Sequence, residues 1–249
     1  MRHYSQTTAI TNRTAALARR RQAGFTLLEI AIVLVIIGLI VGAAAIGKDV
    51  RRNAIYQRIA SDYVQGWAIA YDRYYDGTGH PPGDTPATPT GRVNASGTPG
   101  ADGTALCGLA LRTQMQAAGI TMPAGRAAGA EDVYVYEDSN GVPHQLQVCF
   151  KNVRWSEPDA TPGNFVTRSR NVMVLEGMTP ALANLLDNVF DSLADARFGN
   201  LREQSQADNL TATSANWSVD ERMAYGSTAA TARDESQVAE VQGYLKMTR

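Results

Sequence analysis

The sequence is poor in the residues that most enzyme mechanisms use. Its 249 residues include three histidines and two cysteines, and no GxSxG, HExxH, P-loop or CxxC pattern occurs. Those patterns are typical of serine hydrolases, zinc peptidases, phosphate-binding loops and redox or metal sites. Only His80 and His144 follow the first 24 residues, and the sequence suggests no cysteine–histidine pair. We therefore expect neither an enzyme nor a bound cofactor.

Acidic residues are absent from positions 1–24, which contain five arginines. The remaining chain has 18 basic and 24 acidic residues, a net charge of −6. No basic patch stands out in this acidic part, whereas a nucleic-acid-binding surface needs one. We therefore expect no nucleic-acid partner.

Proline is absent from a long apolar run, Phe25–Ile46. As a helix, its 22 residues would extend about 33 Å, which is enough to span the hydrocarbon core of a bilayer. Arginines 19–21 precede the run, so the positive-inside rule keeps the N-terminus in the cytoplasm and exports the rest. The length of the chain accommodates such an anchor and a globular domain.

Three interpretations of the apolar run are open, and they differ over its single acid, Glu29. The run could be a secretory signal peptide cut after Ala43-Ala44-Ala45, although it is longer than the usual apolar region of about 7–15 residues. It could be a plain single-pass anchor in which Glu29 reaches the cytoplasmic interface. In the third interpretation the carboxylate of Glu29 has a function of its own.

The motif GFTLLE at residues 24–29 resembles the class III leader of type IV prepilins and type II secretion pseudopilins. The resemblance implies that a prepilin peptidase/N-methyltransferase cuts between Gly24 and Phe25 and methylates the new N-terminus, Phe25. Glu29 would then meet the α-amine of Phe25 in a neighbouring pilin or pseudopilin subunit. A buried ion pair stabilises weakly but fixes register well, so we expect Glu29 to act in assembly.

The resemblance also implies a location and a partner. It places the chain in the bacterial inner membrane as a single-pass protein with a periplasmic C-terminal domain, on an inner-membrane assembly platform. Assembly would move it into an extracellular or periplasmic filament. Gly38 matches a glycine that is common in the family, but the proline that many type IV pilins have near position 46 is missing.

The predicted fold is α+β and pilin-like, with a long N-terminal helix packed on a small antiparallel sheet, additional helices and long loops. The segments are a leader at 1–24, a transmembrane assembly helix at 25–47, its amphipathic continuation at 48–76 and a periplasmic globular domain at 77–249. Asp76-Gly77 is expected to end the helix. Apolar residues at three- and four-residue steps predict a core-facing stripe rather than a ligand site: Ile55, Ile59, Tyr63, Trp67, Ala70, Tyr71 and Tyr74.

Residues 77–103 are rich in Gly, Pro, Thr and Ser without a repeat. The stretch HPPGD within them resembles the loop that follows the first helix of many pseudopilin-like proteins. We therefore expect an ordered loop with turns at residues 82–83 and 99–100 rather than a flexible linker. Asp84 and Asp102 are weak candidates for calcium ligands, with local turn caps as the alternative.

A helix over 106–120 and a hairpin with strands 133–136 and 146–150 around Asn140-Gly141 are expected next. A third strand is expected over 171–178, and residues 244–249 are expected to form a last edge strand. Cys107 and Cys149 are expected to form a disulfide if the domain is exported, with Cys149 on the return strand facing the 106–120 helix. Two separately buried thiols are the alternative.

A further helix is expected over 179–202, because Thr179-Pro180 is a typical N-terminal pair. Asp187 and Asp191 share one of its faces, which we interpret as solvated rather than as an acid–base or metal site. The stretch also resembles a signature of some prepilin-like proteins, with Gly199 and Arg202 in its last two places.

The sequence thus predicts a structural subunit of a type IV pilus or a type II secretion pseudopilus. Its size and irregular loops favour a minor subunit. The alternative is a non-polymerising envelope binding protein with a plain N-terminal membrane anchor.

Overall fold

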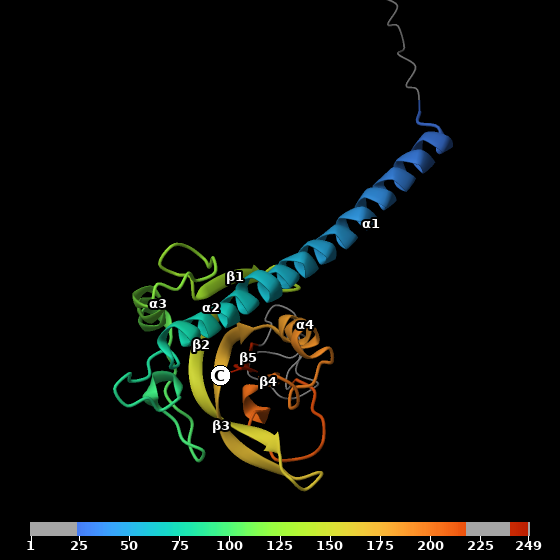
Figure 1. Cartoon of the computed structure of the whole chain (residues 1–249). Helices are drawn as coiled ribbons and strands as arrows, with labels where there is room; N and C mark the ends of the chain where they lie inside the picture. Colours follow the sequence, from blue (N-terminus) through green and yellow to red (C-terminus); the bar gives the residue numbers. More distant parts are fainter. Residues whose placement is uncertain (1–23, 218–239, 249) are drawn as a thin grey trace, which may run out of the picture. The chain divides into compact units, whose positions relative to one another are not determined.

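A long N-terminal helix, a five-stranded antiparallel sheet and additional short helices make up the structure (Figure 1). It is a computed structural model that describes residues 24–217 and 240–248 and, of residues 44–46, the backbone alone. The chain divides into two compact units, residues 1–47 and 48–249, and each is described by itself. This is the α+β, pilin-like architecture predicted from the sequence. Apart from Gly24, the predicted leader lies outside the described residues.

The first helical segment extends from Leu27 to Thr78 in three consecutive elements. α1 (Leu27–Arg58) and α2 (Gln65–Thr78) are α-helices, and η1 (Ile59–Val64) between them is a π-helix. The sequence predicted the helix but not the π-turn, because such a turn lengthens the backbone hydrogen-bonded ring and leaves the apolar spacing recognisable. The predicted end at Asp76-Gly77 was too early: Gly79, with a φ of 78°, is the left-handed cap and donates to the carbonyl of Tyr75.

The aromatic stripe of this segment is core, as predicted. Ile59, Ala60, Tyr63 and Val64 of η1 are buried, and so are Trp67, Ala70, Tyr71 and Tyr74 of α2. The ring centroid of Phe150 on the sheet lies 4.9 Å from that of Tyr71 and 6.2 Å from that of Trp67. These buried aromatic contacts fix the helix on one face of the sheet.

The sheet has the strand order β1-β2-β3-β5-β4, and every neighbouring pair is antiparallel. Its strands are β1 (Val133–Glu137), β2 (Pro143–Pro158), β3 (Phe165–Met178), β4 (Leu201–Glu203) and β5 (Val241–Lys246). The predicted hairpin and third strand are confirmed, but β2 and β3 extend well beyond the predicted strands. The prediction that the C-terminal strand lies at an edge was wrong, because β5 pairs with both β3 and β4.

Successive side chains of β2 and β3 point to opposite faces of the sheet, and each face carries its own apolar cluster. Leu146, Val148 and Phe150 face the helix, together with Met173 and Leu175 of β3. On the opposite face, a smaller cluster contains Cys149, Val153, Trp155, Val172, Val174, Ala207 and Tyr244. The central strands are therefore buried on both faces.

A disulfide joins Cys107 to Cys149, as predicted for an exported domain. Cys107 precedes α3 (Gly108–Ala117), which is shorter than the predicted helix over 106–120. Leu106 and Phe150 exchange backbone hydrogen bonds of 2.7 and 3.0 Å beside the disulfide. The covalent bond and this bridge hold the end of the 79–107 loop against β2, and the loop has turns at 82–83 and 99–100 as predicted. It also contains the short helix η2 (Val93–Ala95).

The predicted helix over 179–202 is confirmed only in its first half. α4 (Pro180–Asp191) begins after Thr179, whose side chain accepts a hydrogen bond from the Leu182 N–H. It ends at Ser192, which has a φ of 64°. The chain then turns back to form β4 and the short helix η3 (Gln204–Gln206). α4 ends at Ser192 because the carboxylate of Asp191 accepts hydrogen bonds from the backbone of residues 200 and 201. The helical spacing of apolar residues does not reveal these contacts.

His144, on β2, links the β1–β2 turn to the start of β5. Its Nε2 lies 3.0 Å from Asp138 Oδ2, and its Nδ1 lies 2.8 Å from Glu240 Oε1. Burial lowers the pKa of this imidazole, but the hydrogen bonds and negative charges of Glu240 and Asp138 outweigh burial and raise the pKa above its ordinary value. Asp138 also accepts the N–H groups of Asn140 and Val142 at 2.8 Å. The imidazole therefore joins the hairpin turn to the start of β5.

The disulfide predicts a large loss of stability on substitution. Cys107→Ser should lower the free energy of unfolding by about 4 kcal/mol in the chain-entropy model, because the two cysteines are 42 positions apart. Urea unfolding of the full chain in detergent, followed by tryptophan fluorescence, would measure the loss. Reduced wild-type protein should lose about as much, and two freely alkylated thiols in wild type purified from membranes would contradict the bond.

The His144 cluster predicts a stability that depends on pH. Because its pKa is raised in the folded chain, the contribution is complete below the unfolded value of about 6.5 and is lost as the pH rises through the folded pKa. Glu240→Gln should reduce the free energy of unfolding by about 1 kcal/mol at pH 6, since a partly exposed charged hydrogen bond is removed. The same substitution should also reduce the loss of folding stability that occurs as the pH rises above about 6.5.

Urea unfolding at a series of pH values would test this dependence. Glu137→Gln is the matched control, because Glu137 is an exposed acid on the neighbouring strand β1. An identical pH profile for wild type and Glu240→Gln would rule out the contribution.

Candidate functional site

The start of α1 is a capped helix end. Gly24, Phe25 and Thr26 are not helical, and the helix begins at Leu27. The side chain of Thr26 accepts a hydrogen bond from the Glu29 N–H at 3.2 Å, and its carbonyl accepts from Glu29 and Ile30 at 3.1 and 3.2 Å. Thr26 and Glu29 have the spacing of a capping box, and a carboxylate in the first turn is favoured by the helix dipole. The T-x-x-E pattern is a sequence signal for this helix end, which the prediction of an assembly role for Glu29 did not include.

The first half of α1 presents a run of exposed apolar side chains. Phe25 and Leu27 are 78% and 92% exposed, and the exposed apolar set continues along the helix: Leu28, Ile30, Ile32, Val33, Leu34, Val35, Ile36, Ile37, Leu39, Ile40 and Val41. The most apolar 18-residue window has a mean hydropathy of 3.0, and none of it is buried. By length and composition, this helix can cross a membrane.

Two glycines, Gly38 and Gly42, lie within this apolar surface, and contacts inside the described chain do not require a glycine at either position. Apart from the adjacent residues and the neighbouring backbone of the same helix, a Cβ atom placed on Gly38 or Gly42 would meet no atom of the described chain within 4 Å. By contrast, a Cβ on Gly66 would lie 3.0 Å from the Cβ of Pro123, so close packing between α2 and the segment after α3 accounts for that glycine. Packing within the described chain therefore explains Gly66 but not Gly38 or Gly42.

The carboxylate of Asp84 caps its own loop. It accepts hydrogen bonds from the N–H groups of Thr85, Thr90 and Gly91 and from the hydroxyl of Thr90, at 2.8 to 3.1 Å. Burial raises the pKa of this carboxyl, but these donors outweigh burial and lower it below its ordinary value. Both oxygens are thus occupied by donors, which is the local-cap alternative considered from the sequence.

Asp102 has a different set of partners. It accepts from the backbone N–H of Arg154 at 2.9 Å and lies 3.3 Å from the Nε of the same residue and 3.6 Å from Lys151 Nζ. It therefore ties the long loop to β2. Within residues 24–217 and 240–248, no group of three or more His, Cys, Asp or Glu side chains gathers where it could hold a metal ion.

The prediction that Asp187 and Asp191 share a solvated helix face was wrong for Asp187, whereas Asp191 is partly exposed. Asp187 is fully buried, and its Oδ2 accepts from the Asp195 N–H at 2.7 Å and from the Trp217 indole at 3.0 Å. Burial is the main cause that raises the pKa of Asp187, to about 7, and the nearby carboxylates of Asp191 and Asp195 raise it further. Its Oδ1 is buried without a partner among the described residues.

Asp191 organises the turn that follows α4. Its carboxylate accepts from the N–H groups of Asn200 and Leu201 at 2.8 to 2.9 Å. Gly199 has a φ of 90°, and a Cβ there would lie 2.5 Å from the Asp191 carboxylate. Arg202 donates to the Gly199 carbonyl, and its guanidinium lies 4.1 Å from the Trp155 ring. The Asp, Gly and Arg of the predicted signature thus form one structural unit.

The two histidines among the described residues, His80 and His144, are not paired with a nucleophile. His80 Nδ1 lies 3.1 Å from the carbonyl oxygen of Pro81, and His144 is held between two carboxylates. Among the described residues, neither imidazole is hydrogen-bonded to a serine, threonine or cysteine side chain, which a hydroxyl or thiol nucleophile would need.

Comparison with known proteins points to the same segment. Residues 19–45 match the family model described as the prokaryotic N-terminal methylation motif. The match includes the arginine cluster, GFTLLE and most of the apolar run. Comparisons with curated proteins and with solved structures found no match.

Proposed function

We propose that this chain, which its N-terminal methylation motif identifies as a prepilin-type protein, is a minor structural subunit of a type IV pilus or a type II secretion pseudopilus. A prepilin peptidase would cut it between Gly24 and Phe25 and methylate Phe25. The mature chain would then join other subunits through its N-terminal helix on an inner-membrane assembly platform. The motif itself does not distinguish a pilin from a pseudopilin.

The observation that supports assembly most directly is the exposed apolar surface of α1. A bilayer could cover this surface before assembly, and the equivalent helices of other subunits could cover it afterwards. Gly38 and Gly42 fit this role, because glycines without internal contacts permit close approach between helices in an apolar environment.

Glu29 is proposed to set the stagger between neighbouring subunits. Cleavage before Phe25 would create an ammonium group at the positive end of the helix dipole, where a cation is unfavourable. The carboxylate of Glu29 in a neighbouring subunit would neutralise it. Because a buried charge without its partner costs several kcal/mol, only one stagger of two helices would be tolerated.

The disulfide supports a periplasmic location for the domain. Disulfides persist in oxidising compartments such as the bacterial periplasm and are rare in the cytosol. The arginine cluster before the apolar run, with its positive-inside orientation, favours the same side for residues 48–249.

A non-polymerising protein with a plain membrane anchor is the second candidate. The position of Glu29 in the first turn of α1 favours it, because the helix dipole there stabilises a carboxylate without any neighbouring subunit. The two candidates differ in whether a neutral side chain at position 29 affects more than the helix end.

Glu29→Gln should permit cleavage and membrane insertion but reduce incorporation into filaments at least about tenfold, because leaving one partner of a buried ion pair uncompensated costs about 3–5 kcal/mol. Quantitative immunoblotting of sheared filaments against the membrane fraction would measure incorporation. Asp49→Asn is the matched control, since Asp49 lies on the same helix and is exposed. Equal incorporation of both variants would rule out the register role.

The mature N-terminus is expected to be N-methyl-Phe25. Mass spectrometry of the N-terminal peptide from the membrane fraction would identify it, and a Gly24→Lys variant should retain the full leader. A chain that starts after Ala45 would instead establish a secreted soluble protein. An intact Met1 in wild type would establish the plain anchor.

A further inference from the structure

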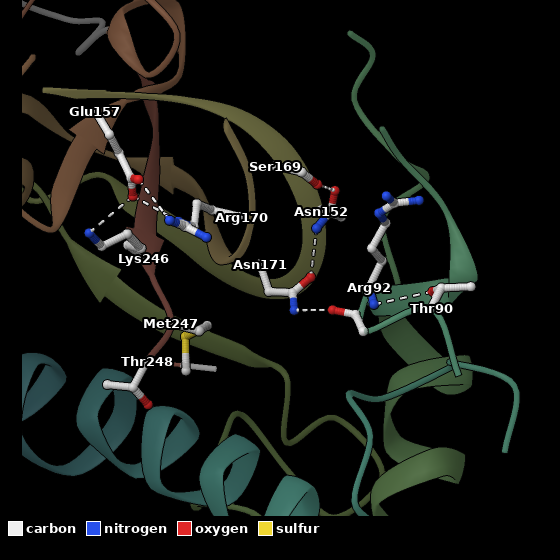
Figure 2. A pocket seen from close by; sticks show the side chains of 11 residues that line it. Thr90, Arg92, Asn152, Glu157, Ser169, Arg170, Asn171, Lys246, Met247 and Thr248 are labelled. Carbon is white, nitrogen blue, oxygen red and sulfur yellow. Dashed lines mark hydrogen bonds and ion pairs between the residues drawn. The ribbon is translucent and has the colours of Figure 1, made fainter. Parts of the chain in front are cut away.

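An open cleft lies between the loop after α2, the β2–β3 hairpin and the end of β5. Its volume is about 600 Å³, within the range of about 300–1,000 Å³ that is typical of small-molecule sites. Figure 2 shows Glu157, Arg170 and Lys246 at one end, Arg92 at the other and two asparagines between them. All of these residues belong to the unit 48–249.

Positive charge exceeds negative charge in this cleft. Glu157 is the acidic residue among the described residues that line it, and three cations surround its carboxylate. Arg170 binds both oxygens at 2.7 Å, Arg168 lies at 3.4 Å and Lys246 at 3.9 Å. The hydrogen bonds and charge of Arg170 are the main reason that the pKa of Glu157 is lowered. A single carboxylate cannot neutralise these cations, in a chain that is net acidic after residue 24.

Arg92 adds a further cation at the opposite end. Its guanidinium makes no hydrogen bond or ion pair with the described residues, and no dashed line reaches it in Figure 2. Its backbone is fixed nonetheless: its N–H donates to the Thr90 hydroxyl at 3.2 Å, and the neighbouring Val93 N–H donates to Asn171 Oδ1 at 3.0 Å. The guanidinium is therefore held at the cleft while its donors remain available to a ligand.

The floor of the cleft is a fixed polar network. Asn152 and Asn171 are 2% and 7% exposed, and Asn152 Nδ2 donates to Asn171 Oδ1 at 2.8 Å. Ser169 donates to Asn152 Oδ1, and Asn171 Nδ2 donates to the Gly91 carbonyl at 2.9 Å. These bonds connect β2, β3 and the loop. The walls are thus preorganised, which lowers the cost of binding a ligand.

We propose that this cleft binds a small oxyanion-bearing ligand of the sugar-acid class, with Arg92, Arg170 and Lys246 as its charge partners. Guanidinium groups match carboxylate and phosphate oxygens in a bidentate way. The hydroxyl oxygens of Thr90, Ser169 and Thr248 also line the cleft. A hydroxyl that donates one hydrogen bond can still accept one, so these oxygens suit the hydroxyls of a sugar, and the volume exceeds what an inorganic ion fills. Glu157 competes with the ligand for Arg170 and Lys246. This role goes beyond assembly and holds whether or not the chain polymerises.

Isothermal titration of the full chain in detergent would test the proposal with three probes. Glucuronate carries the carboxylate, glucose is its neutral counterpart and inorganic phosphate is a simple oxyanion. Arg92→Gln should weaken glucuronate binding about five- to tenfold, as expected for one charge-assisted contact at a partly exposed site. Arg126→Gln is the matched control, because Arg126 is exposed and does not line the cleft. Glu157→Gln should tighten binding, since it releases Arg170 and Lys246.

Saturable binding of glucuronate but not glucose, weakened by Arg92→Gln alone, is the expected result. Phosphate binding as tight as that of glucuronate would support an oxyanion cleft and overturn the sugar-acid class. Failure of both anions to bind wild type, or equal losses in Arg92→Gln and Arg126→Gln, would overturn the site. Because the Arg92 guanidinium makes no hydrogen bond or ion pair with the described residues, the Arg92→Gln variant is expected to fold normally, and thermal unfolding would verify this.

Discussion

The packing of η1 and α2 against one face of the sheet is the contact on which the rest of the domain depends. Trp67 and Tyr71 meet Phe150 on β2, and Tyr63 meets Tyr134 on β1 with ring centroids 5.2 Å apart. Each buried aromatic side chain contributes on the order of 2–3 kcal/mol by removal of its apolar surface from water. The same contact leaves the opposite face of the sheet to a smaller cluster around Trp155, which is why Arg202 and the disulfide can lie there.

Much of this arrangement could be predicted, because the signals were local. The aromatic stripe repeats at helical spacing, the hairpin has an Asn-Gly turn, and Thr179-Pro180 marks the start of α4. The GFTLLE motif is equally local, and the family model matches it. Where residues close together in the chain determine an element, the sequence pattern is sufficient to predict that element.

What the sequence did not predict depends on residues that are distant in the chain. Asp191 ends the helical run by accepting from residues nine and ten positions later, and Asp187 is buried by Trp217. Helical spacing placed both carboxylates on a polar face but could not show what would cover it. β5 lies between β3 and β4 because its pairing with both is non-local, and a short C-terminal strand has no sequence signal for an internal position. The cleft is unpredictable for the same reason, since its cations come from a loop, β3 and β5.

The two roles of Glu29 fit together in the proposed cycle. A carboxylate in an apolar segment is expensive unless it has a partner in every state that the chain visits. In the single chain, the first turn of α1 supplies favourable N–H dipoles, and Thr26 caps the same turn. In the proposed filament, the α-amine of a neighbouring Phe25 would supply a stronger partner. Because the ion pair with a neighbouring subunit would stabilise the carboxylate more than the helix dipole does, assembly would be favoured. The helix dipole would meanwhile lower the cost of placing Glu29 of the unassembled subunit in the membrane. A neutral residue at position 29 would lose both the interaction with the helix dipole and the proposed ion pair, whereas loss of the Thr26 hydroxyl would remove only its hydrogen bond to the backbone N–H of residue 29.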